Sequence, residues 1–141
     1  MNTNSENPKV GKAFEKLACK TLEKYFGCSF ETGVKLPIGN PPKLHEFDCA
    51  SDDRRIVAEC KCYTWTDTGN VPSAKLMGMN EAVFYMSYLP SDTKKVLVLK
   101  KAVHARKNET LAEYYYRINN HLLEQITLIE IDEFGFVRKI K

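Results

Sequence analysis

The sequence lacks any long hydrophobic run. Its longest unbroken apolar stretch, residues 82–86, is far shorter than the roughly 20 residues that cross a bilayer, so we expect no membrane-spanning segment and no membrane partner. The polar first ten residues contain no apolar core, so we expect no secretory signal. Hydrophobic residues make up 43% and charged residues 28% of the chain, close to the average of soluble proteins, which excludes a disordered or fibrous chain.

The chain also lacks the cysteine spacings of a zinc finger or a disulfide scaffold. Five cysteines are an odd number, and Cys60 and Cys62 have no Cys-x-x-Cys motif or histidine pair beside them. We therefore expect reduced thiols, no zinc site and a cytoplasmic protein. The 21 Lys and Arg against 18 Asp and Glu give a net charge of +3, which permits a nucleic-acid partner without requiring one.

The chain has the size of one domain, and we expect a single domain over 1–141, with a core at about 8–131 and a polar tail at 1–7. The order of elements αβββαβαβ predicts an α/β fold with a mixed sheet between helices. The predicted helices are 8–26, with one apolar stripe and ended by Gly27, 73–88, and 111–122, which a capping box of Thr110 and Glu113 opens. The third helix has its apolar residues on one face: Leu111, Tyr115, Ile118 and Leu122. The predicted strands are 28–36, with a bulge or bend at Gly33, 45–50, 54–63, 95–101 and 126–131, with a short last strand at 136–140.

Three charged residues of the predicted hairpin 45–63 form the candidate site. Glu59 and Lys61 are two residues apart on a strand that is otherwise apolar on both faces, so their side chains share a face of a central strand. Asp48 lies on the partner strand and can approach Glu59 across the pair. Carboxylates about 4 Å apart repel each other by about 4 kcal/mol at an effective dielectric near 20. A hard cation such as Mg²⁺ or Mn²⁺ would turn this repulsion into binding.

Such a site suits the hydrolysis of a phosphodiester bond. The cation lowers the pKa of a water molecule and neutralises charge on the phosphate oxygens. Lys61 would orient the attacking water or stabilise the transition state. The main-chain carbonyl of Cys60 would be a further metal ligand, and Glu15, on the first helix, would hold a water molecule or a second ion.

An opening helix with a glutamate, followed by an aspartate about a dozen residues before Glu-x-Lys, resembles the PD-(D/E)xK nuclease superfamily. The matching segments are GKAFE at 11–15, HEFD at 45–48 and ECK at 59–61, and the resemblance covers roughly residues 8–100. It implies the restriction-endonuclease-like fold, a three-layer α/β/α architecture whose core order is αβββαβ. By the same resemblance Asp48 and Glu59 bind the metal, Lys61 is the catalytic lysine and Glu15 is an auxiliary acid. Phenylalanine stands at the place of the proline in the superfamily's name.

We therefore expect a Mg²⁺- or Mn²⁺-dependent endonuclease that hydrolyses double-stranded or branched DNA. Similar small members of the superfamily include Holliday-junction resolvases and the catalytic domains of methyl-directed restriction enzymes. Resolving branched DNA would need two active sites, hence a homodimer. The same chemistry would also cleave RNA. The alternative is a non-catalytic nucleic-acid- or protein-binding module on a nuclease-like scaffold.

Basic and aromatic residues after the predicted catalytic strand are candidates for phosphate contacts and base stacking. They are Lys94, Lys95, Lys100, Lys101, Arg106, Lys107, Trp65 and Lys75.

Each of these interpretations has a structural alternative. Lysines at strand ends also add solubility, Lys75 can be an ordinary surface lysine, and Trp65 can anchor a loop. Asp48 can bond to a turn, and Glu59 with Lys61 can be an exposed ion pair. Glu15 can be a solvated residue that pairs with Lys12 or Lys16.

Overall fold

Six strands form one mixed sheet at the centre of the chain. The computed structural model describes residues 8–70 and 73–141, so the predicted tail 1–7 lies outside the described residues. The strand order is β1-β2-β3-β4-β5-β6; β3, β4 and β5 are mutually parallel, and the other neighbours are antiparallel. The strands are β1 (Phe30–Ile38), β2 (Lys43–Ser51), β3 (Ile56–Lys61), β4 (Lys94–Lys100), β5 (Ile126–Ile131) and β6 (Val137–Lys139).

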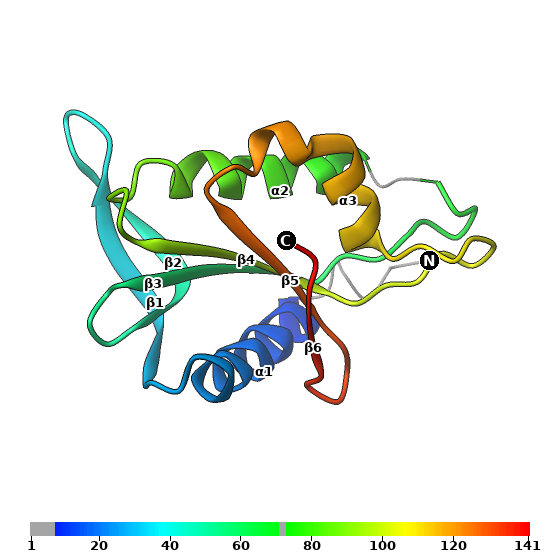
Figure 1. The fold of residues 1–141 in the computed structure, drawn as a ribbon, viewed down its shortest axis with the longest axis horizontal. Coiled ribbons are helices and arrows are strands. Elements are labelled where there is room, and N and C mark those ends of the chain that lie inside the picture. Colours follow the sequence, from blue (N-terminus) through cyan, green and yellow to red (C-terminus); the bar gives the residue numbers. More distant parts are fainter. Residues whose placement is uncertain (1–7, 71–72) are drawn as a thin grey trace.

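Helices cover both faces of this sheet. Helix α1 (Pro8–Phe26) lies on one face, and α2 (Ser73–Met86) and α3 (Leu111–Asn119) lie on the other (Figure 1). A short 3₁₀ helix, η2 (Asn120–Leu122), follows α3. The predicted α/β class with a mixed sheet is confirmed. In the part of the chain that the structure describes, every helix is too short or too polar to span a membrane.

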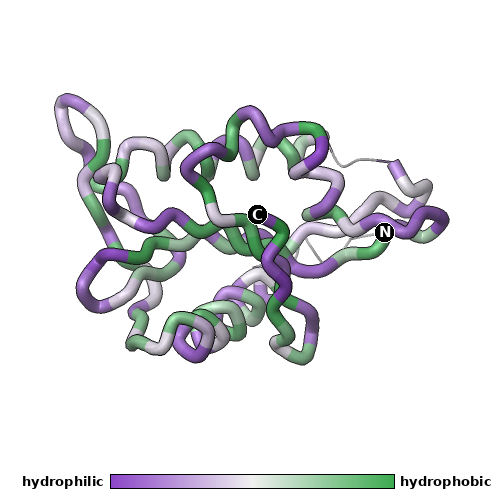
Figure 2. The backbone as a smooth tube through the Cα atoms, in the orientation of Figure 1, coloured by the Kyte–Doolittle hydropathy of each residue, from purple (hydrophilic) through white to green (hydrophobic). Residues whose placement is uncertain are grey.

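The sheet separates two hydrophobic clusters, because alternate side chains of a strand point to opposite faces. Figure 2 shows hydrophobic residues along the central strands and hydrophilic ones in many of the turns. The cluster on the α1 face includes Phe14, Leu22 and Val98, and the cluster on the other face includes Met79 and Leu128. Strand β3 lies third of six, as its apolar sequence predicted.

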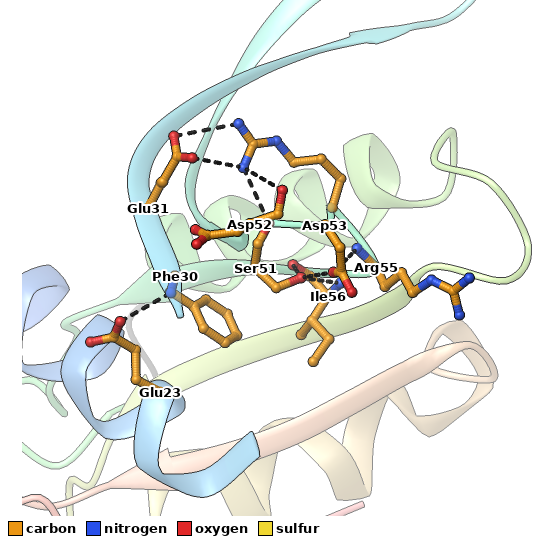
Figure 3. Close-up of polar contacts among 9 residues, drawn as sticks. Glu23, Phe30, Glu31, Ser51, Asp52, Asp53, Arg55 and Ile56 are labelled. Carbon is orange, nitrogen blue, oxygen red and sulfur yellow. Dashed lines mark hydrogen bonds and ion pairs between the residues drawn. The ribbon is translucent and has the colours of Figure 1, made fainter. Parts of the chain in front are cut away.

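Polar contacts fix the turn between β2 and β3, which sets the register of the hairpin that carries the candidate site. The Asp53 carboxylate accepts hydrogen bonds from the Ser51 hydroxyl at 2.8 Å and from the Arg55 N–H at 3.0 Å. The Ser51 hydroxyl in turn accepts from the Ile56 N–H at 3.0 Å (Figure 3). The turn follows the end of β2 that pairs with the start of β1. The β1 residues after Gly33 pair with the other end of β2.

The first two helices follow their sequence signals. Helix α1 begins at Pro8 and ends before Gly27, whose φ of 68° is the left-handed conformation that glycine adopts easily. In α2, packing favours glycine at position 78, because a Cβ there would lie 2.7 Å from the Tyr63 hydroxyl oxygen. Glycine therefore lets α2 approach the segment that follows β3.

The third helix is shorter than predicted. Thr110 and Glu113 form the predicted capping box, but α3 ends at Asn119 rather than near residue 122. Ile118 and Leu122, expected on the buried face, are 45% and 44% exposed. After the helix ends, the chain turns and inserts the neighbouring Leu123 into the core instead.

Candidate active site

Asp48 and Glu59 face each other where β2 and β3 separate. The last ladder pairs of these strands are Ala50 with Val57 and Cys49 with Ala58, and the next position in the same register sets Asp48 opposite Glu59. The regular pairing does not continue to that position. Directly opposed residues on one antiparallel pair are close neighbours, so the register brings the two carboxylates together.

The two carboxylates replace the missing ladder with reciprocal hydrogen bonds. The Asp48 N–H donates to Glu59 Oε1 at 3.0 Å, and the Cys60 N–H donates to Asp48 Oδ2 at 2.7 Å. Each side chain thus satisfies a backbone amide of the opposite strand that separation would leave unpaired. These bonds engage one oxygen of each carboxylate. Within residues 8–70 and 73–141, the other two oxygens, Asp48 Oδ1 and Glu59 Oε2, have no hydrogen-bond partner and are not fully buried.

A kink in the strands lies at the same place. Gly33 of β1 has φ 61°, and the regular β1–β2 pairing skips Gly33 and Asp48. Phe47 packs in the cluster on the α2 and α3 face, whereas Cys49 packs in the α1 cluster, although residues two apart normally share a face. The bend expected at Gly33 is therefore present, and it turns the β2 backbone at the candidate site.

Burial disfavours two negative charges on the carboxylate pair. Burial, followed by the charge of Asp48, raises the pKa of Glu59 to about 8. Burial also raises the pKa of Asp48, against the hydrogen bond from the Cys60 N–H, which lowers it. Without a cation the pair therefore retains a proton near neutral pH.

Glu15 lies beside this pair on α1. Its charge raises the pKa of both Asp48 and Glu59, and its Oε2 lies 3.3 Å from Lys12 Nζ. The pairing with Lys12 that the alternative interpretation expected is present, but the Glu15 side chain is only 26% exposed and also lines a pocket with Asp48. The pocket has a volume of about 140 Å³, and its lining is Lys12, Glu15, Lys16, Thr32, Gly33, Glu46 and Asp48.

Lys61 is the last residue of β3 and is partly buried. Its positive charge lowers the pKa of Asp48 and of Glu59, so the amine lies within electrostatic reach of both carboxylates. It forms no ion pair within 4.0 Å with any carboxylate of the described residues. The amine is therefore near the pair but not bonded to it.

The donor atoms at this junction are oxygens, the kind of ligand that a hard divalent cation prefers. One open oxygen remains on each of two adjacent carboxylates. The Cys60 N–H points toward β2, and the carbonyl of the same residue points to the same side of an extended strand, which adds a third oxygen. No cluster of three His, Cys, Asp or Glu side chains that could hold a metal occurs among the described residues. Two carboxylates with a carbonyl suit Mg²⁺ or Mn²⁺, which retain several water molecules.

The predicted nucleic-acid contacts of β4 lie at two opposite ends of the strand. Lys100 and Lys101 follow the end that lies beside Lys61, whereas Lys94 lies roughly 20 Å away at the start of the strand. The prediction for Lys95 is wrong, because its side chain is 1% exposed and donates to Pro90 O at 3.1 Å. The strand begins with its second residue turned into the core, so a contact with nucleic acid is excluded there.

Trp65 and Arg106 hold loops together. The Trp65 indole N–H donates to Ala102 O at 3.0 Å, and its ring meets the His104 ring edge-on at 4.8 Å. Arg106 donates to Thr68 O at 2.7 Å. These contacts favour the interpretation of Trp65 as a loop anchor.

The remaining two basic candidates are placed differently. Lys107 is exposed in the loop between β4 and α3. Lys75 Nζ lies 5.3 Å from the centre of the Tyr63 ring, near the start of α2. The predicted basic residues thus do not form one continuous surface.

Five residues that line the pocket were not assigned to the site from the sequence: Lys12, Lys16, Thr32, Gly33 and Glu46. The signal for Glu46 was its place two residues before Asp48, and the signal for Lys16 was its place next to Glu15. Thr32 carried no such signal, because only the bend at Gly33 brings β1 to the pocket.

A comparison of the chain with models of known protein families finds no match, and comparisons with curated protein sequences and with solved structures find none either.

Proposed function

We propose that this protein is a metal-dependent endonuclease of the PD-(D/E)xK type that hydrolyses phosphodiester bonds in DNA, with a restriction-endonuclease-like three-layer fold. The observation that carries the proposal is the pair of Asp48 and Glu59, each of which accepts a hydrogen bond from a backbone N–H of the opposite strand and leaves one oxygen open. A structural ion pair would place a cationic side chain between such carboxylates, and none of the described residues does so.

The residues of this site divide the work between binding and positioning. Asp48, Glu59 and the Cys60 carbonyl would hold Mg²⁺ or Mn²⁺, and when bound the ion supplies an activated water and neutralises phosphate charge. Lys61, near both carboxylates but bonded to neither, would donate to the attacking water or to a phosphate oxygen. Glu15, held by Lys12, would orient a water molecule in the pocket.

A homodimer is part of this proposal, because branched DNA needs two such sites. The outer surface of α2 supports it: Met77 and Phe84 are 72% and 58% exposed on a helix that also buries its inner face, and Tyr88, two residues after the helix, is 50% exposed. A helix that is apolar on both sides commonly has a partner on each. Light scattering of the purified protein measures the oligomeric state directly.

Nicking of supercoiled plasmid tests the enzyme. The wild type is compared with Asp48→Asn, Glu59→Gln and Lys61→Ala in Mg²⁺, in Mn²⁺ and in EDTA, with Glu31→Gln as a matched control on the exposed side of β1. We expect metal-dependent nicking that each site variant lowers by roughly 100-fold or more and that the control leaves unchanged. Equal nicking by the wild type and all variants would point to a contaminating nuclease and contradict the proposal.

The alternative function is a binding module with the same scaffold and no hydrolytic activity. It is favoured by the presence of two carboxylate side chains, rather than three, at the junction. DNA binding without nicking in either metal would select it. Competition between double-stranded DNA, branched DNA and RNA in the same assay identifies the substrate.

A further inference from the structure

A row of lysines runs along the exposed side of α1. Lys16, Lys20 and Lys24, here the lysine row, recur every fourth residue, and all three are exposed. Neighbours in the row are about 6 Å apart along the helix axis, and each step rotates the row by about 40° around it. No ion pair occupies any of the three among the residues that the structure describes. The row is therefore a line of unneutralised positive charge.

The row connects two pockets on opposite flanks of α1. Lys16 lines the pocket that holds Asp48, on the β1 and β2 flank. Lys20 and Lys24 line a second pocket of about 410 Å³, the aromatic groove, between α1 and the turn that joins β5 to β6 (Figure 1). The groove is lined by Leu17, Lys20, Thr21, Lys24, Tyr25, Phe134, Gly135 and Val137.

The turn at the groove presents two aromatic rings to solvent. Phe134 and Phe136 are 76% and 73% exposed, the highest exposures among the large hydrophobic residues described. The Asp132 carboxylate accepts from their N–H groups at 2.8 and 3.0 Å, so the turn is held in place without burying the rings. Gly135, in a left-handed conformation between them, allows the turn to lie against Thr21 of α1. Exposed aromatic rings on a held turn, beside lysines, suit unpaired bases, whose faces are free to stack.

The charged residues that line the aromatic groove, Lys20 and Lys24, are both positive. The two acidic residues of the same turn, Asp132 and Glu133, line a different pocket with Lys100 instead of the aromatic groove. Glu23, the other acid in this part of α1, accepts a hydrogen bond from the Phe30 N–H at 3.0 Å and is directed toward β1. A polyanion along the lysine row would therefore meet positive charge at the groove, whereas Glu15, Glu46 and Asp48 line the pocket at the Lys16 end, where the proposed cation would bind.

We propose that a single strand of DNA lies along α1, contacts the lysine row through its phosphates and stacks unpaired bases on Phe134 and Phe136. The inference rests on the proposed function, because the strand that lies along α1 would be the one that leaves the cleavage site. It assigns the substrate class: DNA with a single-stranded branch or tail rather than an uninterrupted duplex, in which stacked bases cannot reach the aromatic rings.

Fluorescence anisotropy in EDTA tests this path apart from cleavage. The probes are a labelled 12-nucleotide oligo(dT) and a blunt duplex of mixed sequence. The test variants are the pair Phe134→Ala with Phe136→Ala, and the pair Lys20→Gln with Lys24→Gln. The matched control removes two exposed charges elsewhere, at Lys43 and Arg55, again by substitution with glutamine.

We expect the aromatic variant to lose roughly 5- to 150-fold in affinity for oligo(dT) for each of the two rings that stacks a base, and to keep the wild-type affinity for the blunt duplex. The lysine variant should lower the slope of log affinity against log salt by about 1.4 for oligo(dT), since each single-strand phosphate contact contributes about 0.7. The control should change neither quantity. The aromatic residues are exposed, so these substitutions leave the fold intact.

Three results would overturn the proposed path: no oligo(dT) binding by the wild type, wild-type affinity in the aromatic variant, or binding to phosphatidylserine vesicles without binding to oligo(dT). Plasmid nicking by the wild type tests the proposed enzymatic activity separately from these results. Nicking that persists without oligo(dT) binding overturns the path alone. Oligo(dT) binding that depends on the aromatic residues, in a protein that does not nick DNA, supports the path and contradicts only hydrolysis.

Discussion

Replacing Glu59 by glutamine should stabilise the metal-free protein at alkaline pH and leave it nearly unchanged near pH 5. Burial and the charge of Asp48 raise the pKa of Glu59 from 4.5 to about 8 in the folded protein. Glutamine removes the ionisation but keeps an oxygen that can accept the hydrogen bond from the Asp48 N–H. The substitution therefore isolates the cost of the charge from the loss of the contact.

The direction of this effect follows from the protons bound in each state. Below pH 4.5 the carboxyl is protonated in both the folded and the unfolded chain, so it does not change the stability. Between pH 4.5 and 8 it ionises in the unfolded chain but stays protonated in the folded one, so the free energy of unfolding falls as pH rises. Above pH 8 the fall is complete, and it reaches up to about 5 kcal/mol for the pKa difference cited.

Urea denaturation at unit steps from pH 5 to 9, in EDTA, measures this fall. The single tryptophan, Trp65, reports unfolding through its fluorescence. We expect the wild type to lose up to about 1.4 kcal/mol per pH unit within the window and Glu59→Gln to lose much less. Glu31→Gln, at an exposed carboxylate, should follow the wild type. An equal fall in Glu59→Gln and the wild type would refute a buried, proton-retaining carboxylate at this position.

The remaining predictions concern a buried ion pair, two lysines and the cation. Arg138→Ala should lower the free energy of unfolding by about 2–4 kcal/mol, because it leaves Glu130, which is 1% exposed, without its partner at 2.9 Å. Arg54→Ala, at an exposed ion pair, should lower the free energy of unfolding by no more than about 1 kcal/mol in the same urea titration. Lys95→Met should leave the affinity for duplex DNA unchanged in an anisotropy titration, because the side chain is buried. Lys101→Ala should lower the slope of log affinity against log salt by about 0.9. An equal loss of affinity in both variants would contradict the placement of these side chains. Adding Mn²⁺ at 100 times its dissociation constant should stabilise the wild type by about 2.7 kcal/mol above pH 8, and a thermal shift of the same size in Glu59→Gln would argue against this cation site.

Much of the fold was readable from the sequence because its signals are local. The apolar stripe of α1, the glycine after it and the capping box at Thr110 each depend on residues a few positions apart. The apolar character of β3, apart from Glu59 and Lys61, likewise predicted a strand covered on both faces. Such features survive folding because no distant contact has to be known in advance.

The features that could not be predicted depend on how distant segments meet. Lys95 belongs to a basic stretch, but the turn before β4 directs its side chain under Pro90, which the sequence does not show. Likewise, Ile118 continued the apolar spacing of α3 and is exposed because the chain leaves the sheet surface soon after that residue. The reciprocal bonds of Asp48 and Glu59 required both the register of the hairpin and the point at which its strands separate.

The separation of β2 from β3 makes local opening of the candidate site measurable by hydrogen–deuterium exchange. The amide protons of Asp48 and Cys60 are protected from hydrogen–deuterium exchange by side chains, whereas their neighbours in the hairpin are protected by a backbone ladder. Exchange at these two amides therefore reports local opening of the carboxylate pair independently of global unfolding. A residue-resolved exchange experiment would follow the site itself, even in a preparation that shows no catalysis.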